Sequence, residues 1–133
     1  MTGNSVFYGG GGFWASGGGA SGSTLYKCTL TGNSAISDDG YGGDGGGADS
    51  SSLYDCTLTG NSAESGGGVY GCTLFDCTVM RNTARLGGGV CAPSWWGGSA
   101  VVYNCTLVGN TAQEGGGVYG PGVELHNSVI LGQ

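Results

Sequence analysis

Basic side chains are scarce in this sequence, which holds only Lys27, Arg81 and Arg85 among its 133 residues. Nine Asp and Glu residues bring the formal net charge to −6, so no positive surface is available for phosphate groups. We therefore expect neither nucleic acid nor an anionic lipid surface as a partner. Long apolar runs are missing too. None approaches the roughly 20 residues that cross a bilayer, so we expect no membrane insertion.

Metal-ligating side chains are also few. His126 is the single histidine and no Cys-x-x-Cys pair occurs, which argues against zinc. The acidic segment 38–49 contains Asp44-Gly-Gly-Gly-Ala-Asp49, one glycine short of the calcium-binding Gly-Gly-x-Gly-x-Asp repeat. That repeat works in arrays and calcium requires six or more oxygens, so a solvated loop is the simpler interpretation. We predict no metal and no cofactor, and calcium binding by this loop stays open.

What the sequence does contain is one short phrase repeated along its length, of which Leu53-Tyr-Asp-Cys-Thr-Leu-Thr-Gly-Asn61 is the clearest copy. Each copy closes on an amide side chain, which marks the phase of the repeat. These positions are Asn4, Asn33, Asn61, Asn82, Asn110 and Gln133. Successive marks lie 21 to 29 residues apart. A period of this length is typical of a solenoid in which one small unit stacks on the next.

Each phrase is predicted to form one strand with a buried face, because apolar and polar residues alternate along it. In 25–31 the face of Tyr26, Cys28 and Leu30 would be buried, and the face of the threonines would be wet. Stacked copies would then form three columns along the axis. The aromatic column would be Tyr26, Tyr54, Phe75, Tyr103 and His126; the thiol column Cys28, Cys56, Cys77, Cys105 and Ser128; the aliphatic column Leu30, Leu58, Val79, Leu107 and Ile130.

A second phrase, Gly-Gly-Gly-Val, follows the asparagine after a fixed gap in most copies, as at Gly66–Val69. The 33 glycines and many β-branched residues of the whole sequence exclude a helical chain. We predict an all-β fold, a parallel β-helix of about five coils, forming one domain over residues 1–133. Two or three short strands per coil would be joined at glycine-rich corners, with stacked asparagines at one bend. Inserted loops are expected at 37–44 and 92–98.

The Leu-x-x-Asn and Gly-Gly-Gly-Val phrases resemble the paired Phe-x-x-Asn and Gly-Gly-Ala-Ile repeats of polymorphic outer-membrane proteins and related bacterial surface proteins. The resemblance covers nearly the whole chain, with Leu or Val in place of the phenylalanine and Gly in place of the alanine. It implies a right-handed β-helix and an extracellular or cell-surface location. Members of this group include adhesins and autotransporter passengers, so the resemblance implies no single activity.

Catalysis is not expected. Polysaccharide-cleaving β-helices gather carboxylates with Arg or Lys in one groove, because they must neutralise a uronate and move a proton. Here the acids are concentrated in one loop and the three bases are scattered. The six cysteines are predicted to be mainly buried thiols, with Cys72 and Cys91, which lie off the thiol column, the better candidates for a covalent link.

Two other features suggest binding. Trp95 and Trp96, in the second insert, could stack on sugar rings, or could cover the sheet flank or a neighbouring subunit. Outward Thr-x-Thr pairs at 29–31 and 57–59 resemble those of ice-binding solenoids, but two intact rungs make only a small patch.

The two ends of the sequence share one phase of the coil and carry no segment of the type that blocks edge pairing. We expect a head-to-tail contact in which Ile130 and Gln133 of one copy meet Val6 and Asn4 of the next, and such contacts propagate into a fibre. The leading hypothesis is therefore a structural extracellular protein that assembles with itself into a filament. The alternative is an adhesin-like binding module, a fragment of a longer passenger that contacts glycan or host through its inserted loops. The sequence does not decide whether the chain is complete.

Overall fold

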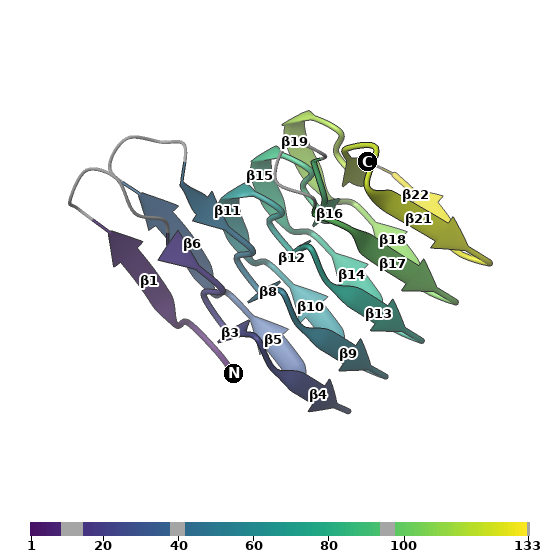
Figure 1. The fold of residues 1–133 in the computed structure, drawn as a ribbon, viewed down its shortest axis with the longest axis horizontal. Coiled ribbons are helices and arrows are strands. Elements are labelled where there is room, and N and C mark those ends of the chain that lie inside the picture. Colours follow the sequence, from purple (N-terminus) through teal and green to yellow (C-terminus); the bar gives the residue numbers. More distant parts are fainter. Residues whose placement is uncertain (9–14, 38–41, 94–97, 133) are drawn as a thin grey trace.

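The fold is a right-handed parallel β-helix of about five coils, seen in a computed structural model that describes residues 1–8, 15–37, 42–93 and 98–132. Within these ranges every regular element is a strand. Each strand pairs in parallel with its counterpart in the next coil, and the two termini lie toward opposite ends of the stack (Figure 1). The predicted fold class is confirmed.

Four parallel sheets run along the axis, so each complete coil contributes four short strands. Sheet A contains β5 (Thr29–Thr31), β10 (Thr57–Thr59), β14 (Thr78–Met80), β18 (Thr106–Val108) and β22 (Val129–Leu131). Sheet B contains β1 (Ser5–Tyr8), β6 (Ser34–Ser37), β11 (Ser62–Ser65), β15 (Thr83–Leu86) and β19 (Thr111–Glu114), with β2 (Ala15–Ser16) and β7 (Gly43–Asp44) beside them. Sheet C contains β3 (Ala20–Ser21), β8 (Ala48–Asp49), β12 (Val69–Tyr70), β16 (Val90–Cys91) and β20 (Val118–Tyr119). Sheet D contains β4 (Thr24–Tyr26), β9 (Ser52–Tyr54), β13 (Thr73–Phe75), β17 (Ala100–Tyr103) and β21 (Val123–His126).

The phrase predicted as one strand is two strands, one in sheet D and one in sheet A. A corner residue with positive φ separates them, such as Asp55 at φ 54° between β9 and β10. The chain turns there, so the inward positions of the two strands are Leu53 and Leu58, both with 0% exposure. The predicted burial of the aromatic column is therefore wrong. These rings lie on the outer face of sheet D, where Tyr26 is 66% exposed.

The interior is a narrow apolar column inside the four sheets. The predicted aliphatic column is buried in the inner coils, since Leu30, Leu58, Val79 and Leu107 each show 0% exposure. A second column from sheet D faces it across the core. This second column consists of Leu25, Leu53, Leu74, Val102 and Leu125. Because every coil adds the same residues to the same columns, the core has no centre and can be extended coil by coil.

The predicted asparagine column lies at the corner between sheets A and B and is confirmed. From Asn4 to Asn82, each Asn side chain donates from Nδ2 to the Oδ1 of the Asn in the next coil, at 3.0 Å from Asn33 to Asn61 and 3.0 Å from Asn61 to Asn82. The same Oδ1 also accepts the backbone N–H of the preceding Asn, at 2.9 Å from Asn61 to Asn82. All four inner members have 0% exposure, so the column satisfies backbone groups that water cannot reach.

The glycine phrases form the corner between sheets B and C. Gly66 has φ +67°, the left-handed region that costs other residues about 1–2 kcal/mol. A Cβ on Gly67 would lie 2.5 Å from the Thr83 oxygen and 2.6 Å from the Gly88 oxygen, both in the backbone of the next coil. Side chains are excluded here because backbone atoms of the next coil occupy the place of a Cβ.

Candidate assembly surfaces

The aromatic column is a continuous stack on the outside of the molecule. Ring centroids lie 4.9 Å apart between Tyr26 and Tyr54 and 5.1 Å apart between Tyr54 and Phe75. The spacing continues at 5.1 Å to Tyr103 and 4.5 Å to His126, with interplanar angles of 13° or less. Each inner ring is covered on both faces by its neighbours. Only the two end rings, Tyr26 and His126, have a face not covered by this stack.

The thiol column sits at the corner between sheets D and A. Cys56, Cys77 and Cys105 are each 2% exposed, and Cys28 is half-buried. Their thiols donate to the carbonyl two residues earlier, for example Cys77 to Phe75 at 3.2 Å. Ser128 continues the column, and its Oγ accepts the Cys105 N–H at 3.1 Å. The column satisfies main-chain groups at this corner, as the asparagines do at the next.

The proposed covalent link through Cys72 or Cys91 is wrong, because all six cysteines lie in the described ranges and all are free thiols. Cys72 precedes β13 and accepts the Ser51 N–H at 3.4 Å, whereas Cys91 lies in β16 opposite Tyr70. The two therefore occupy different columns. Burial raises the pKa of each thiol to about 12, so both are protonated and poor nucleophiles at neutral pH.

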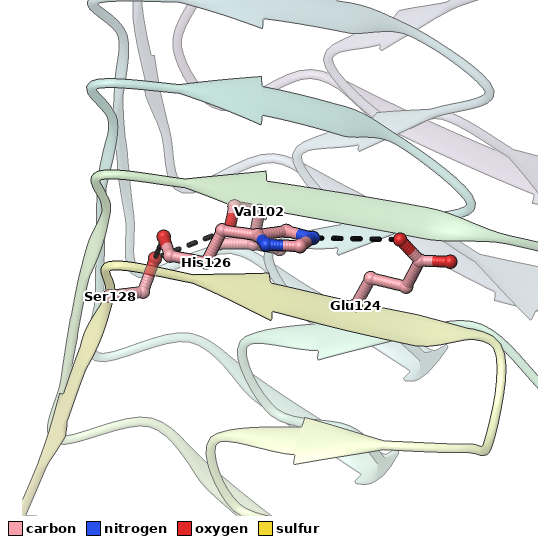
Figure 2. A network of polar contacts seen from close by, with 4 residues as sticks. All are labelled: Val102, Glu124, His126 and Ser128. Carbon is pink, nitrogen blue, oxygen red and sulfur yellow. Dashed lines mark hydrogen bonds and ion pairs between the residues drawn. The ribbon is translucent and has the colours of Figure 1, made fainter.

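A serine, a histidine and a carboxylate meet in the last coil, the residue types of a nucleophilic triad (Figure 2). His126 Nε2 lies 3.5 Å from Glu124 Oε2. The Ser128 hydroxyl, however, contacts the backbone oxygens of His126 at 2.9 Å and Val102 at 3.3 Å. A nucleophile needs its base within hydrogen-bond reach, and the imidazole does not take that place here. His126 is better described as the end of the aromatic column, and Ser128 as the end of the thiol column.

The described part of the acidic segment places Asp44 in β7 and Asp49 in β8. Burial, and next the charge of Asp49, raise the pKa of Asp44 to about 7, while burial raises that of Asp49. No group of three or more His, Cys, Asp or Glu with the spacing of a metal site occurs in the described ranges. Residues 38–41 of the acidic segment, for which calcium binding was left open, lie outside those ranges. Among the residues that the structure describes, no helix is long and apolar enough to cross a membrane.

Trp95 and Trp96, the candidate ligand contacts, lie outside the described residues, in the insert between β16 and β17. The insert predicted at 37–44 overlaps the last residue of β6, Ser37, and the whole of β7 at Gly43–Asp44, so the connection between these strands is residues 38–42. The outward threonines of sheet A are placed as predicted, with Leu30 turned inward between Thr29 and Thr31.

At the N-terminal end, the predicted assembly residue Asn4 adds to the asparagine column by donating from Nδ2 to Asn33 Oδ1 at 3.0 Å. Val6 lies in β1 and pairs with Ala35 of β6. The residues before Asn4 lie against β5 in sheet A, where Thr2 bridges to Thr31. Sequence reasoning missed this contact, since nothing in the residues before Asn4 repeats the Leu-Thr pattern of the other sheet A strands.

At the C-terminal end, columns that are buried elsewhere become exposed. Ile130 is 39% exposed and Leu125 is 43% exposed, although their neighbours Leu107 and Val102 one coil earlier are both at 0%. Val129 and Leu131, on the outer face, are 50% and 55% exposed. Gln133, the other predicted assembly residue, lies outside the described residues. The last coil therefore presents an apolar surface together with the free edges of its strands.

Comparison with known proteins finds a match to one stretch of the repeat. A family model of the Chlamydia polymorphic membrane protein repeat matches residues 55–72, which run from the corner before β10 through β12. The chain is a β-helix repeat protein, and this stretch of it is similar to the polymorphic membrane protein repeat. The matched stretch contains both phrases on which the resemblance was based, Leu58-x-x-Asn61 and Gly66-Gly-Gly-Val69. Such a repeat agrees coarsely with association with an outer membrane or cell surface. Neither the curated proteins nor the solved structures contain a significant match.

Proposed function

We propose that this protein is a structural module of a cell surface, a β-helix that stacks end to end on a second copy of itself to form an extracellular filament. The observation that supports this proposal is that every coil adds the same residues to the same columns, so that a coil of a second copy can continue them. Apolar columns of this kind are stabilised when a further coil covers them.

The open strand edges favour the same contact. β20, β21 and β22 are the last strands of their sheets and pair on one side only, with β16, β17 and β18. Such edges offer rows of main-chain donors and acceptors to another strand. A coil of the same protein fits best because its columns have the same spacing and chemistry. The contact is heterologous and so propagates along the axis.

Sedimentation velocity and negative-stain electron microscopy of the purified chain test the proposal. We expect concentration-dependent growth into unbranched filaments. Ile130→Lys would place a charge in the apolar contact and should hold the protein as a monomer. The matched control is Thr106→Lys, which adds the same charge to the exposed outer face of sheet A one coil earlier and should leave assembly intact. A wild-type chain that stays monomeric at high concentration contradicts the proposal.

The second candidate function is an adhesin-like binding module, favoured by the match to a surface-protein repeat. In that role the β-helix would be a rigid support, and the insert with Trp95 and Trp96 would contact a glycan by stacking on sugar faces. A glycan array compares the wild type with Trp95→Ala and Trp96→Ala. Binding that both substitutions abolish supports this function, and the absence of any glycan signal counts against it.

A further inference from the structure

The thiol column at the corner between sheets D and A is a row of equivalent sulfur atoms, one in each coil. The strands on both sides of this corner are paired in register from coil to coil. Cys28, Cys56, Cys77 and Cys105 therefore occupy the same place in four successive coils. Atoms at the same place in adjacent coils lie one strand spacing apart, about 4.8 Å.

The hydrogen bonds show that the sulfur atoms have the same surroundings in each coil. The Cys56 and Cys77 thiols lie 3.3 and 3.2 Å from the carbonyl oxygen two residues earlier. They also lie 3.6 and 3.5 Å from a carbonyl oxygen of the preceding coil, that of Leu25 and of Leu53. The Cys77 N–H donates to the sulfur of Cys105 at 3.4 Å. An N–H group that already points at a sulfur atom stabilises negative charge on it.

The two cysteines outside this column have no thiol in the adjacent coils. Cys72 accepts the N–H of Ser51, its counterpart in the preceding coil, and its counterpart in the next coil is Ala100. Cys91 pairs with a tyrosine of sheet C on either side. Adjacent thiols therefore occur at the corner between sheets D and A and at no other corner of the described chain.

The spacing of this row fits a metal ion held by two ligands. A bond from a d10 metal ion to a thiolate is about 2.3 Å long, so an ion midway between two sulfur atoms spans about 4.6 Å, close to the strand spacing. Thiolates select soft ions such as Cu(I), which accept linear coordination by two sulfur atoms. The expectation of no metal was based on zinc and calcium, which require several ligands around one point. The described ranges contain no such group of three, because the thiols form a line.

We propose that the thiol column binds soft monovalent d10 ions, Cu(I) or Ag(I), each held linearly between the sulfur atoms of two adjacent coils. Each ion replaces the protons of two thiols, so that R–SH, R′–SH and M⁺ give RS–M–SR′ with one negative charge, and two protons pass to water. No electron is transferred. Cys56, Cys77 and Cys105 are each 2% exposed, which keeps water from the bound ion. The site lies within one chain, so it does not depend on end-to-end assembly.

Two double variants with the same number of thiols test whether adjacency matters. Cys28→Ser with Cys56→Ser, the adjacent variant, leaves Cys77 and Cys105 on neighbouring coils. Cys56→Ser with Cys105→Ser, the alternating variant, leaves Cys28 and Cys77 two strand spacings apart, about 9.6 Å. Serine suits this corner, since Ser128 occupies the same place and accepts the Cys105 N–H at 3.1 Å. Circular dichroism of each variant verifies that it folds.

The measurement is a titration of the fully reduced proteins with Cu(I), without oxygen and in competition with a chromophoric Cu(I) chelator, repeated with Ag(I). We expect the adjacent variant to bind one ion tightly. The alternating variant should bind more than about 100-fold more weakly, because it loses one of two ligands, a larger change than the loss of a second-shell partner. X-ray absorption of the Cu(I)-loaded wild type should show two sulfur ligands per ion.

Equal affinities of the adjacent and alternating variants would overturn the proposal, because the bound ion would then not bridge neighbouring coils. A wild type that binds no more tightly than the alternating variant would overturn it as well. Three or four sulfur ligands per ion would contradict linear coordination along the column.

Discussion

At the scale of single residues, Asn82 joins three coils at once. Its Oδ1 accepts two hydrogen bonds from Asn61, and its Nδ2 donates to the Leu58 oxygen at 3.1 Å and to Asn110 Oδ1 at 3.0 Å. Asn61, Asn82 and Asn110 each have 0% exposure, so loss of the Asn82 amide leaves buried donors and acceptors without partners. We expect Asn82→Ala to lower the free energy of unfolding by about 3 kcal/mol or more, measured by urea denaturation.

A matched control for Asn82→Ala is Asn104→Ala, which also removes an amide but at an exposed corner on the outside of the coil. That substitution should cost about 1 kcal/mol, mainly through its left-handed backbone at φ 52°. Equal losses for the two substitutions would show that burial of the asparagine column contributes nothing.

Arg81 occupies a position that is glycine in the neighbouring coils. Its column contains Gly60 and Gly109, and all three residues have positive φ, 54° for Arg81. Arg81 therefore carries a backbone strain of about 1–2 kcal/mol, which glycine would remove at a cost of about 0.5–1 kcal/mol in unfolded-state entropy. We expect Arg81→Gly to stabilise the fold by about 0.5–1 kcal/mol in thermal or urea unfolding. Destabilisation by this substitution would mean that the guanidinium makes a compensating contact.

At the scale of elements, the glycine corner limits how closely coils can stack. Gly67 has backbone oxygens of the next coil 2.5 and 2.6 Å from the place of a Cβ, whereas Gly60 has no atom within 4 Å of that place. Gly67→Ala should therefore cost more than about 3 kcal/mol, because the backbone of two coils must separate. Gly60→Ala should cost about 1 kcal/mol, from its φ of +64° alone. Equal melting temperatures for the two variants would contradict this difference.

The carboxyl group of Asp44, in sheet B, should make stability depend on pH. Asp44 in β7 has a pKa of about 7 in the folded chain, against its ordinary 3.8, because of burial first and of the Asp49 charge second; the Ser65 hydrogen bond opposes this and Glu64 adds to it. The folded state thus binds this proton more tightly than the unfolded state between these pH values. Its contribution to stability is complete below about pH 4 and is lost as the pH rises through 7.

Unfolding measured from pH 4 to pH 8 tests the effect of Asp44. The wild type should lose stability over this range relative to Asp44→Asn, in which the titrating group is absent. Asp55→Asn, at an exposed corner, is the control and should follow the wild type. Parallel pH profiles for wild type and Asp44→Asn would show that the carboxyl is not desolvated by the coil.

The elements also show where sequence reasoning succeeds and fails. Coil period, asparagine column and aliphatic column follow from the repeated phrase, because residues in one phase must stack. Strand boundaries did not follow, because the corner between sheets D and A depends on one left-handed residue that is Asp in two coils but Lys27 in the first. The alternation of apolar and polar residues is unbroken across this corner in the sequence, although the chain turns there, and so it predicts the wrong face for Tyr26. The contact of Met1–Gly3 with β5 has no pattern that could have predicted it.

At the scale of the whole molecule, the β-helix has no closed core and no centre. Each coil buries its columns only against the coils on either side, which leaves the last coil with Ile130 and Leu125 partly open to water. Stability should therefore increase with the number of stacked coils, as in other solenoids. Assembly of copies would bury the columns of one chain against a coil of the next chain in the same way.

The most direct test of the central claim is the axial repeat of the assembled protein, measured by helical reconstruction from electron micrographs. Direct continuation of the sheets from one copy into the next predicts five strand spacings per copy, about 24 Å. An axial repeat that differs from this length by a strand spacing or more would contradict coil-on-coil stacking. Particles that remain single β-helices under all conditions would contradict end-to-end assembly itself.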